Sequence, residues 1–311
     1  PPPKRAHALR DIERLGALWE APLNVPVGHP YRTVEALRVL LAAGEPFMPL
    51  AHKLFRAYWV EGRAISEPGV LSEILADAGY EPEAILTEAR SETIKTNLRR
   101  RTDEALEDGV FGVPTFRAKE GTIWGIDRLY ALEQAMGLPG GSPGADKGEG
   151  QPWPATFFFD YSSPFAAVAS ARVEAIFDSG VRFHPMLLGA VFRTIGTPMV
   201  PLHTFHETKQ RWARSDLMRQ ARESGFPIQW PSRFPMNTVL PLRVTLLAGP
   251  DTSAGRSLVH ALYRAYWSLD RDIADPEVVA DVASSCGLDG PALVDGASVP
   301  EAKEALRVAT T

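Results

Sequence analysis

Cysteine is nearly absent from this chain, because Cys286 is the single one in 311 residues. One cysteine can form neither an intrachain disulfide nor the Cys-x-x-Cys pair of a disulfide oxidoreductase, which indicates a reducing compartment. No stretch approaches the roughly 18 consecutive apolar residues that a membrane span needs, and no signal peptide is visible. We therefore expect a cytoplasmic protein without a membrane partner.

An excess of basic charge and a metal-ligand pattern are also missing. The net charge is −5 and both signs are interspersed, which argues against nucleic acid as a partner. His203, His206 and Glu207 lie close together, but no further ligand at a suitable spacing follows, so we predict no metal site. The G-x-S-x-G motif that would support Ser-His-Asp catalysis does not occur.

What the chain does contain is a long internal repeat. Residues 4–103 and 209–311 are two versions of one stretch, at an offset of 205 positions that later becomes 208. An internal repeat of this length indicates that the two copies share one fold, which sets the architecture of the chain. The chain starts without Met, opens inside one repeat and stops at the equivalent place in the other, so we interpret it as the middle of a longer, pseudo-dimeric tandem protein. The matched residues include Lys4 with Lys209, Asp11 with Asp216, and Arg56-Ala-Tyr-Trp59 with Arg264-Ala-Tyr-Trp267.

A stretch rich in Gly and Pro separates the copies. Residues 138–152 have almost no apolar content, which is typical of a flexible linker. We therefore divide the chain into three parts. Residues 1–137 are the C-terminal part of the first repeat, residues 138–153 are the linker, and residues 154–311 are the N-terminal part of the second repeat.

Each copy is mostly helical, because its apolar residues recur at three- and four-residue spacing. Proline follows an acidic residue where some of these helices begin, and glycine stands where some of them end. In the first copy the spacing predicts helices over residues 31–43, 51–61, 68–78, 82–89 and 92–107.

The remaining segments predict strands. In the second copy an apolar strand over 156–159, a helix over 164–178 and a parallel strand over 181–187 form a βαβ unit. In the first copy two strands and a helix between residues 115 and 136 form a ββα unit. Together they predict an α/β fold, a thioredoxin-like sheet with all-helical insertion domains. We expect one composite sheet, with strand 157–159 beside strand 115–116 and Ser163 close to Val113.

Ser163 stands at the junction between the strand and the helix of the βαβ unit, directly before Pro164. A hydroxyl at this position can cap the helix, and a structural cap alone would explain it. The same position is also an anion site, because free backbone N–H groups and the positive end of the helix dipole converge there. A thiolate at such a site is stabilised, which lowers a thiol pKa from about 8.5 towards neutrality.

Val113-Pro114 is the second candidate element. A proline after Gly-Val can simply open an edge strand. A cis Val113–Pro114 bond would instead expose the backbone N–H and C=O of Val113 to an extended peptide. We predict the cis bond.

Taken in order, several motifs resemble the 2-hydroxychromene-2-carboxylate isomerase and kappa-class glutathione transferase family, within the DsbA-like thioredoxin superfamily. The resemblance covers nearly the whole chain apart from the linker. The motifs are Phe55-Arg-Ala-Tyr-Trp-Val-Glu-Gly62, Gly109-Val-Phe-Gly-Val-Pro-Thr-Phe116, Trp124-Gly-Ile-Asp-Arg-Leu129, Phe159-Asp-Tyr-Ser-Ser-Pro-Phe165, Met186-Leu-Leu-Gly-Ala-Val-Phe192 and Lys209 with Asp216-Leu217.

The resemblance implies a glutathione site and assigns its residues. Ser163 matches the family serine that hydrogen-bonds the glutathione sulfur. Val113, before Pro114, matches the residue whose backbone pairs with the cysteinyl part. The remaining matches are Ile126 and Asp127 for the γ-glutamyl end, Lys209 for the glycyl carboxylate, and Thr197 in place of the usual asparagine.

The resemblance also implies that a full tandem protein has two sites. The serine partner of Lys4 would lie upstream of residue 1, and the second-copy counterpart of Asp127 would lie beyond residue 311. We therefore expect at most one composite site in this chain.

The implied function is that of a glutathione-dependent isomerase acting on 2-hydroxychromene-2-carboxylate or a similar small aromatic intermediate of aromatic degradation. In the family mechanism the thiolate adds to the chromene, the ring opens, and the thiol leaves after rotation about a carbon–carbon bond. A kappa-like glutathione transferase and a non-catalytic thioredoxin-like binding module are the alternatives. Disulfide exchange is disfavoured because Ser163 stands where redox relatives have Cys-x-x-Cys.

Overall fold

The computed structural model describes residues 2–118, 121–138, 155–177 and 180–311, so residues 139–153 of the predicted linker lie outside the described part. The chain forms two compact units, Pro1–Val110 and Phe111–Thr311. The ββα segment of the first repeat therefore belongs to the same unit as the second repeat. No helix among the described residues is both long and apolar enough to cross a membrane.

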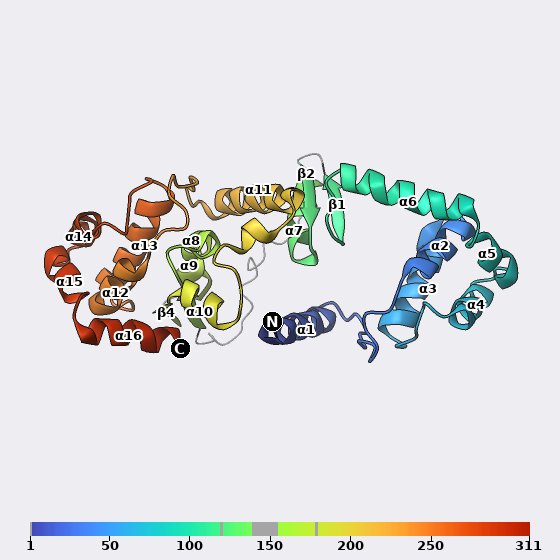
Figure 1. Cartoon of the computed structure of the whole chain (residues 1–311), viewed down its shortest axis with the longest axis horizontal. Helices are drawn as coiled ribbons and strands as arrows, with labels where there is room; N and C mark the ends of the chain where they lie inside the picture. The colour runs from blue at the N-terminus through green and yellow to red at the C-terminus, as the bar shows by residue number, and fades with distance from the viewer. Residues whose placement is uncertain (1, 119–120, 139–154, 178–179) are drawn as a thin grey trace. The chain divides into compact units, whose positions relative to one another are not determined.

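The described residues of the first unit form helices only (Figure 1). Pro68 and Pro82 begin two of them, and the Ser91 hydroxyl caps a third by accepting from the Ile94 N–H at 3.2 Å. Leu75 is among the fully buried core residues. The five predicted helices are confirmed. The helices are α1 (Pro2–Leu18), α2 (Val34–Ala43), α3 (Phe47–Trp59), α4 (Pro68–Asp77), α5 (Pro82–Glu88) and α6 (Glu92–Glu107).

The second unit combines both predicted α/β segments with a bundle of helices. The helix predicted over residues 164–178 is two helices, with a turn at residues 171–172. The elements are β1 (Thr115–Ala118), β2 (Gly121–Trp124), η1 (Ile126–Arg128), α7 (Leu129–Ala135), β3 (Ala155–Phe159), α8 (Pro164–Ser170), α9 (Val173–Phe177), β4 (Val181–Pro185), α10 (Leu188–Thr194), η3 (Pro201–Thr204), α11 (Glu207–Ser224), α12 (Val239–Ala248), α13 (Ser253–Trp267), α14 (Pro276–Ser285), α15 (Gly290–Gly296) and α16 (Pro300–Thr310).

The strands form two separate pairs. β3 and β4 run parallel with Phe157 opposite Phe183, which confirms the βαβ prediction, and β1 and β2 are antiparallel. The predicted composite sheet, with strand 157–159 beside strand 115–116, is wrong for the described residues, because each pair is a two-stranded sheet of its own.

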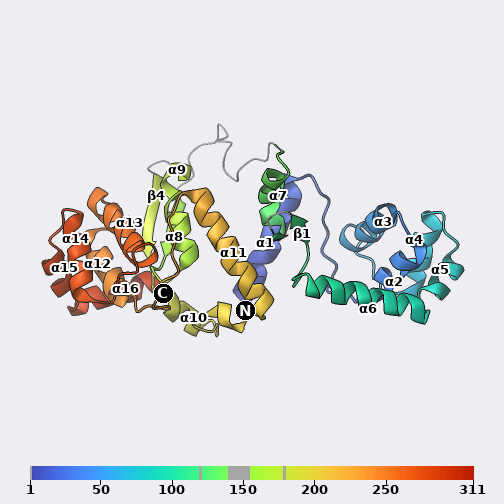
Figure 2. The same cartoon turned by 90° about the horizontal axis from the view of Figure 1, so that it is seen from above.

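Helix α11 explains this separation. Its residues Leu217 and Ala221 pack against Val168 of α8, on the side of the βαβ unit. Its residue Trp212 contacts Trp124 of β2 edge to face, with ring centroids 5.1 Å apart. Figure 2 shows α11 between α8 and α7. Each two-stranded sheet therefore packs on α11 through its own helix or side chains instead of pairing with the other sheet.

The βαβ unit covers the helices of the second unit through a buried aromatic cluster. Tyr161, Tyr263 and Trp267 are each 0% exposed. The Trp267 indole N–H donates to the Tyr161 carbonyl at 2.7 Å, and the Tyr161 hydroxyl bonds the Thr245 hydroxyl at 2.6 Å. These bonds satisfy the polar ends of large rings that are otherwise surrounded by apolar atoms.

The two copies differ in burial at matched positions. Leu242 is 0% exposed, whereas its counterpart Leu37 is 45% exposed. Tyr263 is fully buried, whereas its counterpart Phe55 is 60% exposed. The helices are similar in sequence, and among the described residues a βαβ unit packs on this face in the second unit and not in the first.

Leu242→Ala should therefore destabilise its helix far more than Leu37→Ala. Removing a fully buried leucine side chain costs about 2–5 kcal/mol, and we expect less than about 1.5 kcal/mol at the half-exposed position. Hydrogen exchange at the amides of α12 and α2 measures each local unfolding free energy separately. Equal losses in the two variants would contradict the burial difference.

Candidate functional site

Ser163 caps α8 as predicted. Its Oγ accepts from the Ala166 N–H at 3.2 Å, and its own N–H donates to the Asp160 carbonyl at 2.9 Å. Pro164 is the first residue of the helix, where its missing N–H has no intrahelical partner to lose. A serine hydroxyl has one donor and two acceptor positions. Because Oγ acts as an acceptor in the cap, its proton can be donated to another group.

A buried carboxylate lies at the start of the Ser163 loop. Asp160 is 3% exposed and accepts from the backbone N–H groups of Ser162 and Leu188 and from the hydroxyl of Thr238, at 2.9, 2.8 and 2.7 Å. Burial raises the pKa of the Asp160 carboxyl above its ordinary value, and the three hydrogen bonds work in the opposite direction. The loop is thereby tied to the first residue of α10 and to the start of α12.

The ammonium group of Lys209, in the first turn of α11, lies among aromatic rings. Its Nζ is 4.3 Å from the ring centroid of Phe205, 5.2 Å from that of Trp124 and 5.9 Å from that of Phe111. Trp212 of α11 contacts both Trp124 and Phe111. Ring faces attract a cation, so these aromatic rings stabilise the ammonium group of the half-buried Lys209 side chain.

The Val113–Pro114 bond is cis, as predicted. Val113 is 86% exposed, and the Pro114 carbonyl accepts from the Gly125 N–H at 3.0 Å. Gly112 must lack a side chain, because a Cβ there would lie 2.8 Å from the Trp124 indole nitrogen. The backbone before β1 is therefore packed tightly against Trp124, while Val113 itself faces solvent.

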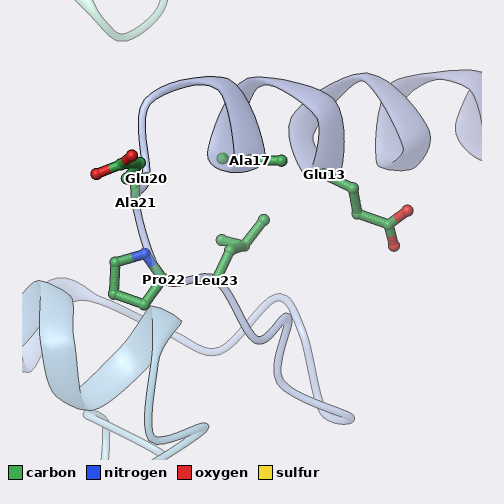
Figure 3. A pocket seen from close by; sticks show the side chains of 7 residues that line it. Glu13, Ala17, Glu20, Ala21, Pro22 and Leu23 are labelled. Atoms are coloured by element: carbon green, nitrogen blue, oxygen red, sulfur yellow. The ribbon is translucent and has the colours of Figure 1, made fainter.

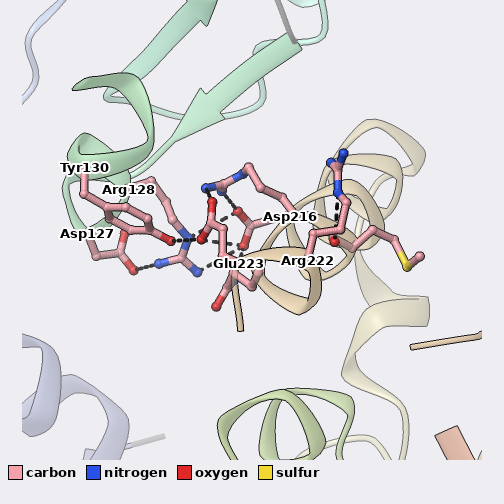
Figure 4. Close-up of polar contacts among 9 residues, drawn as sticks. Asp127, Arg128, Tyr130, Asp216, Arg222 and Glu223 are labelled. Carbon is pink, nitrogen blue, oxygen red and sulfur yellow. Dashed lines mark hydrogen bonds and ion pairs between the residues drawn. The ribbon is translucent and has the colours of Figure 1, made fainter. Parts of the chain in front are cut away.

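Asp127 takes part in an ion-pair network between η1 and α11 (Figure 4), and Ile126 is the first residue of η1. Ile126 is 41% exposed. The Asp127 carboxylate accepts from Arg128 Nη1 at 2.5 Å. Arg128 also donates Nε and Nη2 to the buried Asp216, at 3.2 and 3.0 Å. The exposed Asp127 carboxylate is therefore already partly neutralised by a neighbouring cation.

The same network attaches α7 to α11. Asp216 also accepts from Arg219 and Gln220, and the Tyr130 hydroxyl donates to Glu223 at 3.0 Å. Burial opposes the charge of Arg128, but hydrogen bonds and attraction from Asp216 outweigh it, so the pKa of Arg128 is raised. Burial and the neighbouring Glu223 raise the pKa of the Tyr130 hydroxyl.

The ion pair between Arg128 and Asp216 was not predicted, although the sequence contains a sign of it. Asp216 repeats Asp11 of the first copy, and Arg128 directly follows the predicted Asp127. A repeated aspartate and a motif arginine can form a packing ion pair as well as a ligand site.

The predicted residues fall into two groups. Val113, Ile126 and Asp127 belong to the ββα segment, which docks on α11 near Lys209. Ser163 is held by the loop that begins at Asp160, and the N–H of Thr197 donates to the Phe192 carbonyl of α10 at 2.7 Å. The structure thus gathers one group along α11 and holds the other on the βαβ unit and α10.

A separate pocket of about 380 Å³ lies in the first unit, between α1 and the segment that follows it (Figure 3). It contains no predicted site residue. Its lining is small, apolar and acidic, and consists of Glu13, Gly16, Ala17, Glu20, Ala21, Pro22 and Leu23.

Comparison with known proteins gives a consistent set of relatives. A family model described as a DSBA-like thioredoxin domain matches residues 1–137 and 156–311. Two proteins named 2-hydroxychromene-2-carboxylate isomerase, from Pseudomonas putida and Pseudomonas sp. (strain C18), are 32% and 31% identical over 130 residues. The matched region is 41% of this chain and 63% and 60% of those proteins. The chain therefore spans about three fifths of their length.

Two further similarities are weaker. A protein of the same name from Sphingobium xenophagum is 24% identical over 134 residues, which cover 43% of this chain and 69% of that protein. A solved structure of selenomethionine 2-hydroxychromene-2-carboxylate isomerase aligns with 50% of this chain and 76% of its own, at 23% identity and a TM-score of 0.45. The family match confirms the predicted thioredoxin-like α/β fold in two copies.

Asp216→Asn should loosen the ββα segment. The substitution leaves the half-buried Arg128 facing a neutral amide, and removing one partner of a buried ion pair costs about 3 kcal/mol or more. We expect faster hydrogen exchange at the amides of β1 and β2. Asp11→Asn is the matched control, because Asp11 holds the same repeat position and is exposed. Similar exchange rates in both variants would show that the Arg128–Asp216 pair does not hold the segment.

Proposed function

Since the chain belongs to the DSBA-like thioredoxin domain family, we propose that it is a glutathione-dependent isomerase acting on 2-hydroxychromene-2-carboxylate or a similar aromatic intermediate. The observation that carries the proposal is the Ser163 hydroxyl, which caps α8 as an acceptor and keeps its proton for donation. The names of the relatives that are 31% and 32% identical support the reaction class. Because the matched region covers only part of those proteins, the activity and substrate are part of the proposal.

In this proposal the second unit provides groups of the kinds that glutathione needs, from the βαβ unit and from the ββα segment and α11. Ser163 supplies a hydroxyl proton for the sulfur, and the exposed Val113 supplies backbone groups for the peptide edge. Lys209 supplies an ammonium for the glycyl carboxylate, and Asp127 supplies a carboxylate for the α-ammonium end. When bound, glutathione supplies a thiol, whose ionised form is a nucleophile.

The residues of the chain have complementary roles in this proposal. Ser163 holds the sulfur by hydrogen bonding and favours its ionised form. The rings around Lys209 restrict where its ammonium can lie, and Arg128 moderates the charge of Asp127. The substrate class in this proposal follows from the names of the relatives. A glutathione transferase would use the same groups but would consume glutathione.

Ser163→Ala should reduce glutathione-dependent turnover by about 100-fold or more, the effect of losing one preorganised donor to a developing charge. Stability should fall by only about 1 kcal/mol, because the variant loses a helix cap. Isomerisation of 2-hydroxychromene-2-carboxylate, followed with and without glutathione, measures the effect and reveals any glutathione consumption. Ser162→Ala is the matched control in the same loop. A wild-type rate in Ser163→Ala would remove Ser163 from the mechanism.

Lys209→Met should weaken glutathione binding while leaving the chemistry nearly intact. Methionine keeps an apolar stem among the rings of Phe205 and Trp124 but removes the charge, and a charged hydrogen bond contributes about 1.5–3 kcal/mol. We expect KM for glutathione to rise about tenfold or more with kcat little changed. An equal fall in kcat would place Lys209 at the reacting centre instead.

A further inference from the structure

The carboxylate of Asp160 is surrounded by hydrogen-bond donors from three parts of the second unit. Oδ1 accepts from the Ser162 N–H and from the Thr238 hydroxyl, and Oδ2 accepts from the Leu188 N–H. Ser162 belongs to the loop, Leu188 begins α10 and Thr238 precedes α12. The side chain lies in the interior, at 3% exposure, so water contributes little to satisfying these groups.

The backbone around Asp160 is constrained as well. Its carbonyl accepts from the Ser163 N–H at 2.9 Å and from the Tyr263 hydroxyl at 3.2 Å. The next residue, Tyr161, is held at its carbonyl by Trp267 and at its hydroxyl by Thr245. Asp160 therefore joins the position of Ser163 to helices that contribute no reacting group in the proposed function.

We propose that Asp160 is a positioning residue that acts through Ser163, with its carboxylate fixing the loop from which the Ser163 hydroxyl is presented. This inference rests on the proposed function for its catalytic consequence. It goes beyond that function because Asp160 is buried and is not among the residues proposed to contact glutathione. It also states that this position requires a carboxylate and not merely a polar side chain.

The requirement follows from the directions of the three bonds. An amide has one oxygen and one NH₂ group, so Asp160→Asn can satisfy only one side of the site. If the amide oxygen faces Ser162 and Thr238, its NH₂ group faces the Leu188 N–H. If it faces Leu188, the NH₂ group faces the Ser162 N–H. Either orientation places two donors together in a buried site.

A second substitution removes the conflict without restoring the charge. Leu188 is the first residue of α10, a position that favours proline, and Leu187 before it has the extended backbone that proline requires. In the first orientation, Leu188→Pro deletes the N–H that would oppose the NH₂ group of the introduced asparagine. The double variant should therefore recover part of what Asp160→Asn loses.

The test measures kcat, KM for glutathione and the exchange rates of the Ser162 and Ser163 amides in four variants. We expect Asp160→Asn to lower kcat at least about tenfold, since small displacements of a reacting group are costly, and to expose both amides to exchange. Asp160→Asn with Leu188→Pro should regain at least about threefold of the lost kcat and some amide protection. Thr238→Val, which keeps the carboxylate and two of its donors, should give a smaller loss than Asp160→Asn. Asp251→Asn, which also removes a carboxylate accepting a backbone N–H, should match the wild type.

The outcomes separate this inference from the proposed function. If the wild-type chain shows no glutathione-dependent turnover, the proposed function fails, and the amide exchange rates still decide whether Asp160 fixes the loop. Unchanged Ser163 protection in Asp160→Asn overturns the inference. So does a double variant that is no better than Asp160→Asn in both kcat and amide protection, since a nonspecific loss of structure would not be relieved by Leu188→Pro.

Discussion

The ion pair between Arg128 and Asp216 holds the ββα segment on α11. A buried carboxylate is costly unless cations and donors surround it, and Asp216 has Arg128, Arg219 and Gln220 around it. Because Arg128 comes from the first repeat and Asp216 from the second, this pair joins sequence segments on opposite sides of the linker. The aromatic contact of Trp124 with Trp212 extends the same interface along α11.

The Ser163 loop also contains a buried carboxylate, but among the described residues that of Asp160 accepts hydrogen bonds from neutral donors and not from cations. Three hydrogen bonds offset part of the desolvation that raises its pKa. The position of the Ser163 loop is thus fixed by hydrogen bonds to α10 and to the start of α12, while the position of the ββα segment is fixed by α11. In the proposed function, one of these systems positions the hydroxyl and the other presents the groups that bind the ends of the peptide.

The repeat shows how tertiary context changes the role of similar residues. Trp267 is fully buried and donates to Tyr161, whereas its counterpart Trp59 lies beside His29 with ring centroids 5.2 Å apart. Tyr263 donates its hydroxyl to the loop, and its counterpart Phe55 has no hydroxyl and is exposed. Both copies keep the helices, but the hydrogen bonds to the Ser163 loop form in the second unit, where the βαβ unit packs on them.

The sequence by itself determined the local structure and the nature of the candidate groups. Proline and serine at helix starts, the apolar spacing of the helices and the cap at Ser163 were all predictable, because near neighbours in the chain decide them. The tertiary structure decided which segments meet. Asp11 and Asp216 occupy the same repeat position, so the sequence could not choose between α1 and α11 as the partner of Arg128. That choice, the separation of the two sheets and the burial of Asp160 depend on long-range packing between surfaces, which no local pattern encodes.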